Sequence, residues 1–236
     1  HVFAMGLGEG KAWGARYDAA AANWEVAQEL GPPDYYAQPH ALAAGGGRAA
    51  LIWNHEVEQG DHRLFLRSYD DAAGWGAPEP LGVPGVQTSV PSVAINAAGE
   101  GHVIWRDFGP ERADWRRWGS ANANWDPPTG LASNEVGRWN FFVATADDGD
   151  ATALSVDDTQ LVAFHYSAAQ DAWSPPEVVD PELTWGFDGP VSVQDAAGNI
   201  LTIYYRSAEP YELVFRRFDV SAGTWTDLES LDPDPT

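Results

Sequence analysis

The chain alternates between two kinds of segment. Stretches rich in aliphatic and aromatic residues are separated by short stretches of Ala, Gly, Asn, Asp and Ser. These small and polar residues favour tight turns, and the apolar stretches that flank them favour strands. The pattern therefore predicts a succession of β-hairpins, and no amphipathic helical stretch of useful length interrupts it.

The hairpins recur with a period near fifty residues. Five tryptophans mark the period at intervals of 51, 50, 48 and 52 residues, and they are Trp24, Trp75, Trp125, Trp173 and Trp225. An aromatic residue stands six or seven positions before each marker, namely Tyr17, Tyr69, Trp118, Tyr166 and Phe218. Because turn-forming residues lie between the two, each pair predicts a hairpin whose second strand begins at the marker tryptophan.

A second hairpin precedes each of the last four of these. Its first residues are Pro39, Pro91, Phe141 and Pro190, and a glycine follows eight positions later in every copy: Gly47, Gly99, Gly149 and Gly198. Glycine supplies the positive φ that a tight hairpin turn needs. We expect the proline to open its strand, where its missing N–H does least harm.

Two hairpins per period give four antiparallel strands, a to d in chain order. Such sheets, repeated at this period, are typical of the blades of a β-propeller, so the predicted fold class is all-β. The repeat units span about residues 1–30, 39–81, 91–131, 141–179 and 190–231 of a single domain, 1–236. The first unit lacks strand a, so we expect five blades with the two termini meeting in one blade; a fragment of a larger ring is the alternative.

Composition and charge exclude several functional classes. The 44% of hydrophobic residues is ample for a core, yet no apolar run is long enough to insert into a membrane. The absence of cysteine excludes disulfides, thiol catalysis and thiolate metal sites. A net charge of −22, with a single lysine, repels nucleic acid, so we predict no nucleic-acid partner.

The loops between strands b and c, and between d and the next a, are predicted to carry the function. They vary from copy to copy, whereas the a–b and c–d turns are short and repetitive. Aromatic rings beside charged groups suit a polar, ring-shaped ligand such as a sugar. The candidate ligand-binding residues are Tyr35, Tyr36, His55, Arg106, Asp107, Arg138, Trp139, Trp185, Arg206 and Tyr211. These aromatics could instead plug the ring centre, and we expect the marker tryptophans to pack between blades.

Catalytic and metal signals are weak. The chain has no G-x-S-x-G, P-loop or Rossmann glycine pattern. His55, Glu56, Asp61 and His62 share one loop, but their spacing matches no strong zinc motif. We predict no metal or other cofactor, with calcium kept as a candidate ion. A carboxylate pair at the ring mouth keeps sugar hydrolysis open, with Asp34, Asp107, Asp157 and Asp188 as candidates by position.

The repeat resembles that of bacterial sialidase-like (BNR-type) propeller proteins and, more loosely, that of fucose-binding propeller lectins. The resemblance rests on P-x-V-A-x-x-x-x-G…V-x-W followed by R-Y-D…W-x-x-P-E-x-L, clearest in PSVAINAAGEGHVIW with SYDDAAGWGAPEPL. The Asp box of that family, S-x-D-x-G-x-x-W, is not met, since the nearest stretch, at 219–225, is one residue out of register. No catalytic residue is therefore carried over. The resemblance implies an exported, often glycan-associated propeller, in the extracellular or periplasmic space.

These observations predict a non-catalytic binding module, with carbohydrate as its partner on the loop side. A glycoside hydrolase or polysaccharide lyase with a carboxylate site at the ring mouth is the first alternative. A structural or assembly scaffold is the second. The sequence predicts neither the identity of the ligand nor the oligomeric state.

Overall fold

The fold is all-β, as predicted, in a computed structural model that describes residues 2–8, 11–30, 37–58, 61–82, 87–108, 112–119, 121, 124–131, 139–157, 160–183, 190–195, 197–206 and 212–231. Every regular element among these residues is a β-strand. The described part of the chain therefore has no helix that could cross a membrane. The chain divides into two compact units, residues 1–130 and 131–236, which are described separately.

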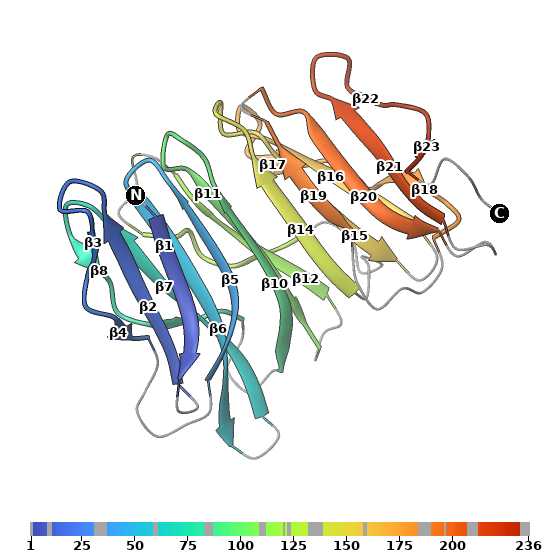
Figure 1. The fold of residues 1–236 in the computed structure, drawn as a ribbon. Helices are drawn as coiled ribbons and strands as arrows, with labels where there is room; N and C mark the ends of the chain where they lie inside the picture. Colours follow the sequence, from blue (N-terminus) through green and yellow to red (C-terminus); the bar gives the residue numbers. More distant parts are fainter. Residues whose placement is uncertain are drawn as a thin grey trace. The chain divides into compact units, whose positions relative to one another are not determined.

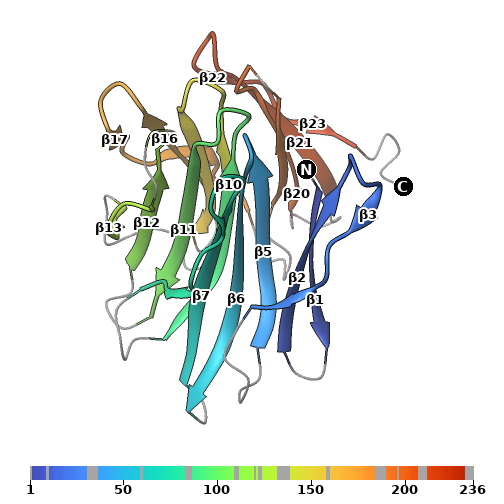
Figure 2. The same cartoon turned by 90° about the vertical axis from the view of Figure 1, so that its left-hand side faces the viewer.

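The first unit contains three antiparallel sheets (Figures 1 and 2). The first sheet consists of β1 (Val2–Gly8), β2 (Lys11–Asp18), β3 (Asn23–Trp24) and β4 (Gln28–Glu29). The second consists of β5 (Ala37–Gly45), β6 (Arg48–Glu58), β7 (Asp61–Asp70), β8 (Gly74–Trp75) and β9 (Glu79–Pro80). The third consists of β10 (Thr88–Ile95), β11 (Gly101–Asp107), β12 (Arg112–Trp118) and β13 (Thr129–Gly130). As expected, the first sheet begins with strand b.

The second unit contains two further sheets of the same kind (Figure 1). One consists of β14 (Trp139–Thr145), β15 (Ala151–Asp157), β16 (Gln160–Ser167), β17 (Ala172–Trp173) and β18 (Glu177–Asp180). The other consists of β19 (Val191–Gln194), β20 (Ile200–Arg206), β21 (Glu212–Asp219), β22 (Thr224–Trp225) and β23 (Glu229–Ser230). In both, neighbouring strands follow the order of the chain, as in a propeller blade.

The register of the outer hairpins confirms the aromatic pairs read from the sequence. Tyr17 lies opposite Trp24, and Tyr69 lies opposite Trp75. The same holds for Tyr166 with Trp173 and for Phe218 with Trp225. The turn glycines of the inner hairpins have φ values of 77°, 81°, 89° and 89° at Gly47, Gly99, Gly149 and Gly198, as predicted.

The prediction that proline opens strand a holds for Pro190, which directly precedes β19 at Val191, but is wrong for Pro39 and Pro91. Strand β5 begins at Ala37 and β10 at Thr88, so both strands start before their prolines. Each strand shifts register at the proline, between Pro39 and Ala41 and between Ser89 and Ser92. In β10 the residues left outside the ladder include Pro91, which has no N–H to leave unpaired. In β5, by contrast, Pro39 pairs with Trp53 and His40 is left out.

The core of each unit lies between consecutive sheets. In the first unit Ile52, Leu66 and Leu81 of the second sheet pack with Trp105 and Trp118 of the third. The marker Trp125 joins the same cluster, and its indole N–H donates to Ser68 Oγ of the preceding sheet at 2.9 Å. The expected packing of marker tryptophans between blades is thus confirmed at this junction.

Candidate functional site

The structure describes four of the predicted ligand-binding side chains. Those four are His55, Arg106, Asp107 and Arg206. Trp139 is described only as the first residue of β14, by its backbone. Tyr35, Tyr36, Arg138, Trp185 and Tyr211 lie outside the described residues, and their proposed role stays a prediction.

Three of the four side chains occupy the same place in the repeat. His55, Asp107 and Arg206 each stand two residues after a buried aromatic of strand b, namely Trp53, Trp105 or Tyr204. Residues two apart on a strand share a face. In the third sheet that face packs on Leu81 of the second sheet, so this position lies beside the blade junction at the loop end.

Asp107 and Asp114 form a pair of buried carboxyl groups. Asp107 is the last residue of β11, it is fully buried, and Trp105 Nε1 donates to its Oδ1 at 3.2 Å. Asp114 lies opposite Trp105 on β12 and is also buried. Burial, followed by the hydrogen bond and the negative charge of Asp114, raises the pKa of Asp107 from 3.8 to about 7.

Arg112 forms an ion pair with Asp114. Its Nε lies 2.9 Å from Asp114 Oδ1, and its Nη2 donates to Asp114 Oδ2 at 3.1 Å. A guanidinium that contacts both oxygens fixes the orientation of the Asp114 carboxyl group. With a pKa of about 7, Asp107 is mostly a carboxylic acid below neutral pH.

Gly82 completes the surroundings of Asp107. Its φ is +75°, and a Cβ built there would lie 2.7 Å from Asp107 Oδ1 and 2.6 Å from Thr88 Cγ2. The hydroxyl oxygen of Thr88 accepts the backbone N–H of Leu64 at 2.7 Å, which links the second and third sheets. The main chain after the second sheet thus passes directly against the carboxyl group.

Arg106 and His55 contribute less to this site. The side chain of Arg106 is mostly buried, and its guanidinium lies 4.7 Å from the ring centroid of Phe108. The imidazole of His55 is buried and meets Phe65 edge to face, with ring centroids 5.4 Å apart. Burial lowers the pKa of His55, so its ring is neutral at pH 7.

Arg206 belongs to the second unit, where it forms ion pairs with Asp180 and Glu182. Its Nε lies 3.2 Å from Asp180 Oδ2, and its Nη2 donates to Glu182 Oε2 at 2.6 Å. Tyr204 also donates to Asp180 Oδ2, at 2.9 Å. Asp180 ends the preceding sheet, so these contacts join two consecutive blades. We therefore interpret Arg206 as a structural residue of this blade junction.

Sequence reasoning missed Asp114 and Asp180. Asp114 could have been found from the register of the b–c hairpin, which places it opposite Trp105. Asp180 stands seven residues after the marker Trp173, as Gly82 does after Trp75, so the repeat itself marks both positions as junction residues. Among the described side chains, no group of three His, Asp or Glu residues is placed to hold a metal ion.

Comparison with solved structures supports the propeller architecture. An ulvan lyase of polysaccharide lyase family PL25, bound to a GlcA-Rha3S unit, matches with a TM-score of 0.57 and 8% identity over 98% of this chain. An α-L-arabinofuranosidase from Podospora anserina, in complex with cellotriose, matches with a TM-score of 0.51 and 14% identity over 87%. The β-propeller domain of the trilobed protease from Pyrococcus furiosus matches with a TM-score of 0.51 and 8% identity over 83%.

These likenesses show the fold alone, because the identities are low and the three proteins differ in activity. The chain spans 69%, 73% and 57% of their respective lengths. No protein-family model matches the chain, and no curated protein matches it by sequence. The fold is therefore a β-propeller of four-stranded blades, while the sialidase-like type and the number of blades stay predictions.

Proposed function

We propose that the protein is a carbohydrate-active enzyme that cleaves glycosidic bonds, with Asp107 as its proton donor. The supporting observation is a carboxyl group at the loop end of a propeller strand that keeps its proton near pH 7. Strongly perturbed carboxyl groups are enriched at catalytic sites, because acid catalysis needs a pKa near the working pH. Two of the matched propellers are carbohydrate-active proteins by name, which favours the same class of substrate.

The chemistry assigned to Asp107 is general acid catalysis. As the bond between the sugar carbon and the glycosidic oxygen breaks, Asp107 gives its proton to that oxygen, and water supplies the hydroxyl of the new sugar end. Asp107 is fully buried, so the strand end must open locally when a glycan binds. Asp114 does not touch the substrate in this scheme and acts by holding the proton on Asp107.

A second carboxylate is required, and Asp114 does not supply it. In glycoside hydrolases the two groups stand about 5 to 9.5 Å apart, whereas the Asp114 carboxyl group is the immediate neighbour of Asp107 on the adjacent strand. Of the candidates by position, Asp34, Asp157 and Asp188, only Asp34 belongs to the same unit as Asp107, and we propose it as the partner. The side chains of all three lie outside the described residues.

The net charge of the chain favours hydrolysis over the lyase alternative. A chain with a net charge of −22 repels a polyanion, and lyase substrates carry a carboxylate next to the bond that is cleaved. We therefore propose a neutral polysaccharide as the substrate class. The proposal includes export to the extracellular or periplasmic space, as the sialidase-like resemblance implies.

The test is a screen for new reducing ends from neutral polysaccharides, followed by variants on the first active substrate. Asp107→Asn keeps the shape of the site and removes the acid, so turnover should fall about 10²- to 10⁴-fold. Asp227→Asn removes the same charge from an exposed position and should leave turnover unchanged.

Saturable binding of oligosaccharides with no product from any of them would contradict the enzyme proposal. That result would support the non-catalytic binding module predicted from the sequence. Full turnover by Asp107→Asn would show that the site still folds and that Asp107 is not the proton donor.

A further inference from the structure

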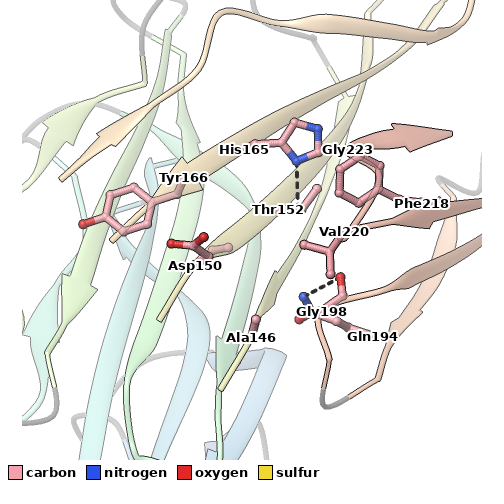
Figure 3. A pocket seen from close by; sticks show the side chains of 11 residues that line it. Ala146, Asp150, Thr152, His165, Tyr166, Gln194, Gly198, Phe218, Val220 and Gly223 are labelled. Carbon is pink, nitrogen blue, oxygen red and sulfur yellow. Dashed lines mark hydrogen bonds between the residues drawn. The ribbon is translucent and has the colours of Figure 1, made fainter. Parts of the chain in front are cut away.

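The second unit has a cavity between its two sheets, on the side of the a–b and c–d turns (Figure 3). Its volume is about 260 Å³, and its walls include apolar Ala146, Phe218 and Val220 beside polar Asp150 and Gln194. Pockets for drug-sized molecules start at roughly 300 Å³. The cavity therefore suits a smaller group, such as the end of one long side chain.

Another blade junction shows what fills this position elsewhere in the repeat. Arg48 follows the turn glycine Gly47, just as Asp150 follows Gly149. Arg48 reaches across to the third sheet, where its Nη1 donates to the carbonyl oxygens of Gly99 at 3.1 Å and Gly119 at 2.9 Å. Its guanidinium carbon lies 4.5 Å from the ring centroid of Trp118. An arginine of the chain itself thus occupies this junction.

The second unit keeps the matching walls but has no arginine at this position. Gly198 corresponds to Gly99 and lines the cavity, and Phe218 corresponds to Trp118. Asp150 is too short to cross between the sheets, and its Oδ1 instead accepts the backbone N–H of Ala168 at 2.7 Å. The cavity thus lies beside the repeat position that Arg48 occupies in the first unit.

The change from arginine to aspartate also reverses the charge of the site. Among the described lining residues the ionisable side chains are Asp150, His165 and Tyr166. His165 stacks on Phe218 with ring centroids 4.5 Å apart, and burial lowers its pKa despite the nearby Glu177. A neutral imidazole leaves the carboxylate of Asp150 as the charged group of the cavity.

We propose that this cavity binds a guanidinium group from outside the chain, the arginine side chain of a peptide or protein ligand. The carboxylate of Asp150 supplies acceptors for its N–H groups through Oδ2 and a second lone pair of Oδ1. The carbonyl oxygen of Gly198, which also accepts from Gln194 Nε2 at 3.2 Å, supplies a further one (Figure 3). The stacked rings of His165 and Phe218 supply a flat surface for its plane, as Trp118 does for Arg48. The net charge of −22 draws a basic partner toward the protein. The site is independent of the proposed glycan cleavage.

The test uses N-acetyl-arginine amide as the probe and N-acetyl-citrulline amide as its uncharged match. Amide NMR spectra should show saturable shifts at Ala151, Thr152, Gly198 and Val220 with the arginine compound. The citrulline compound should bind at least about tenfold more weakly, since it lacks the charge that strengthens hydrogen bonds to a carboxylate. Equal binding of the two compounds would overturn the proposal.

Two variants separate the site from general attraction to an acidic protein. Asp150→Asn should weaken binding roughly tenfold or more, while Asp227→Asn, with the same loss of charge at an exposed position, should bind as the unchanged protein does. Asp150→Arg should place the chain's own guanidinium in the cavity, abolish binding and leave the protein folded. Binding that survives in Asp150→Arg, or shifts confined to other residues, would contradict the inference.

Discussion

At the scale of single residues, a carboxylic acid that keeps its proton is the feature on which the proposed chemistry depends. Trp105 donates to Asp107; besides burial, the negative charge of Asp114 raises the pKa of Asp107, and the positive charge of Arg112 lowers it. Each of these residues comes from the same b–c hairpin. The hairpin supplies these charges and hydrogen bonds, while the main chain at Gly82, after the preceding sheet, contributes to the burial that is the largest cause of the shift.

The first prediction concerns the pH dependence of folding stability. The pKa of Asp107 is 3.8 ordinarily and about 7 in the folded protein, so folding favours its protonated form. Its contribution to stability is full below pH 4 and is lost as pH rises to about 7, by an amount on the order of a few kcal/mol. Urea unfolding of the unchanged protein and of Asp107→Asn, at pH 5 and pH 8, measures this.

Asparagine cannot ionise, so the variant should lose less stability than the unchanged protein between the two pH values. Equal losses would show that Asp107 is ionised in the folded state at both.

The second prediction concerns Asp114 and the pH profile of activity. Replacing Asp114 by Asn removes the negative charge that helps to raise the pKa of Asp107. The alkaline limb of the turnover profile should then move to lower pH. An unchanged limb, with activity merely reduced, would assign Asp114 a purely structural role.

At the scale of elements, short backbone features position the side chains. The main chain at Gly82 passes so close to Asp107 and Thr88 that a Cβ would collide with both. Gly74 has nearly the same φ, +76°, but a Cβ there would meet nothing within 4 Å. The two glycines therefore separate the cost of backbone strain from the cost of a collision.

The third prediction compares alanine at these two positions. Gly74→Ala should destabilise the fold by about 1 kcal/mol through its positive φ alone. Gly82→Ala adds a steric conflict next to the carboxyl pair and should cost about 2 to 3 kcal/mol. Chemical denaturation of the two variants measures the difference, and equal losses would mean that the chain near Gly82 adjusts freely.

The same scale explains how far the sequence could be interpreted. The hairpins, the turn glycines and the pairs of aromatic residues follow from local composition, and the register confirms them. The bulges at Pro39 and Pro91 depend on the partner strand, so no local signal separates a proline that opens a strand from one inside it. The carboxyl pair and the cavity at Asp150 arise from contacts across a hairpin and between sheets, which residue spacing alone does not specify.

At the scale of the whole molecule, the dominant property is charge. The chain has 35 acidic residues against 13 basic ones, and many of the basic residues hold blades together. Arg48, Arg116 and Arg216 all bond to groups of a neighbouring sheet in their own unit. Among the described residues, exposed acidic side chains such as Asp147, Asp195 and Asp227 carry the same charge and repel one another.

The fourth prediction is that salt stabilises the protein. Raising the concentration of sodium chloride from about 20 mM to about 500 mM shortens the screening length several-fold and weakens repulsion between exposed carboxylates. The melting temperature should rise over this range. A fall would show that the ion pairs between blades outweigh the repulsion.

A carbon-13 NMR titration of the Asp107 side-chain carboxyl, assigned by comparison with Asp107→Asn, tests the central claim most directly. The account predicts a titration midpoint near pH 7 for this carboxyl group. A midpoint near the ordinary aspartate value of about 4 would contradict the retained proton, and with it the acid assigned to this site.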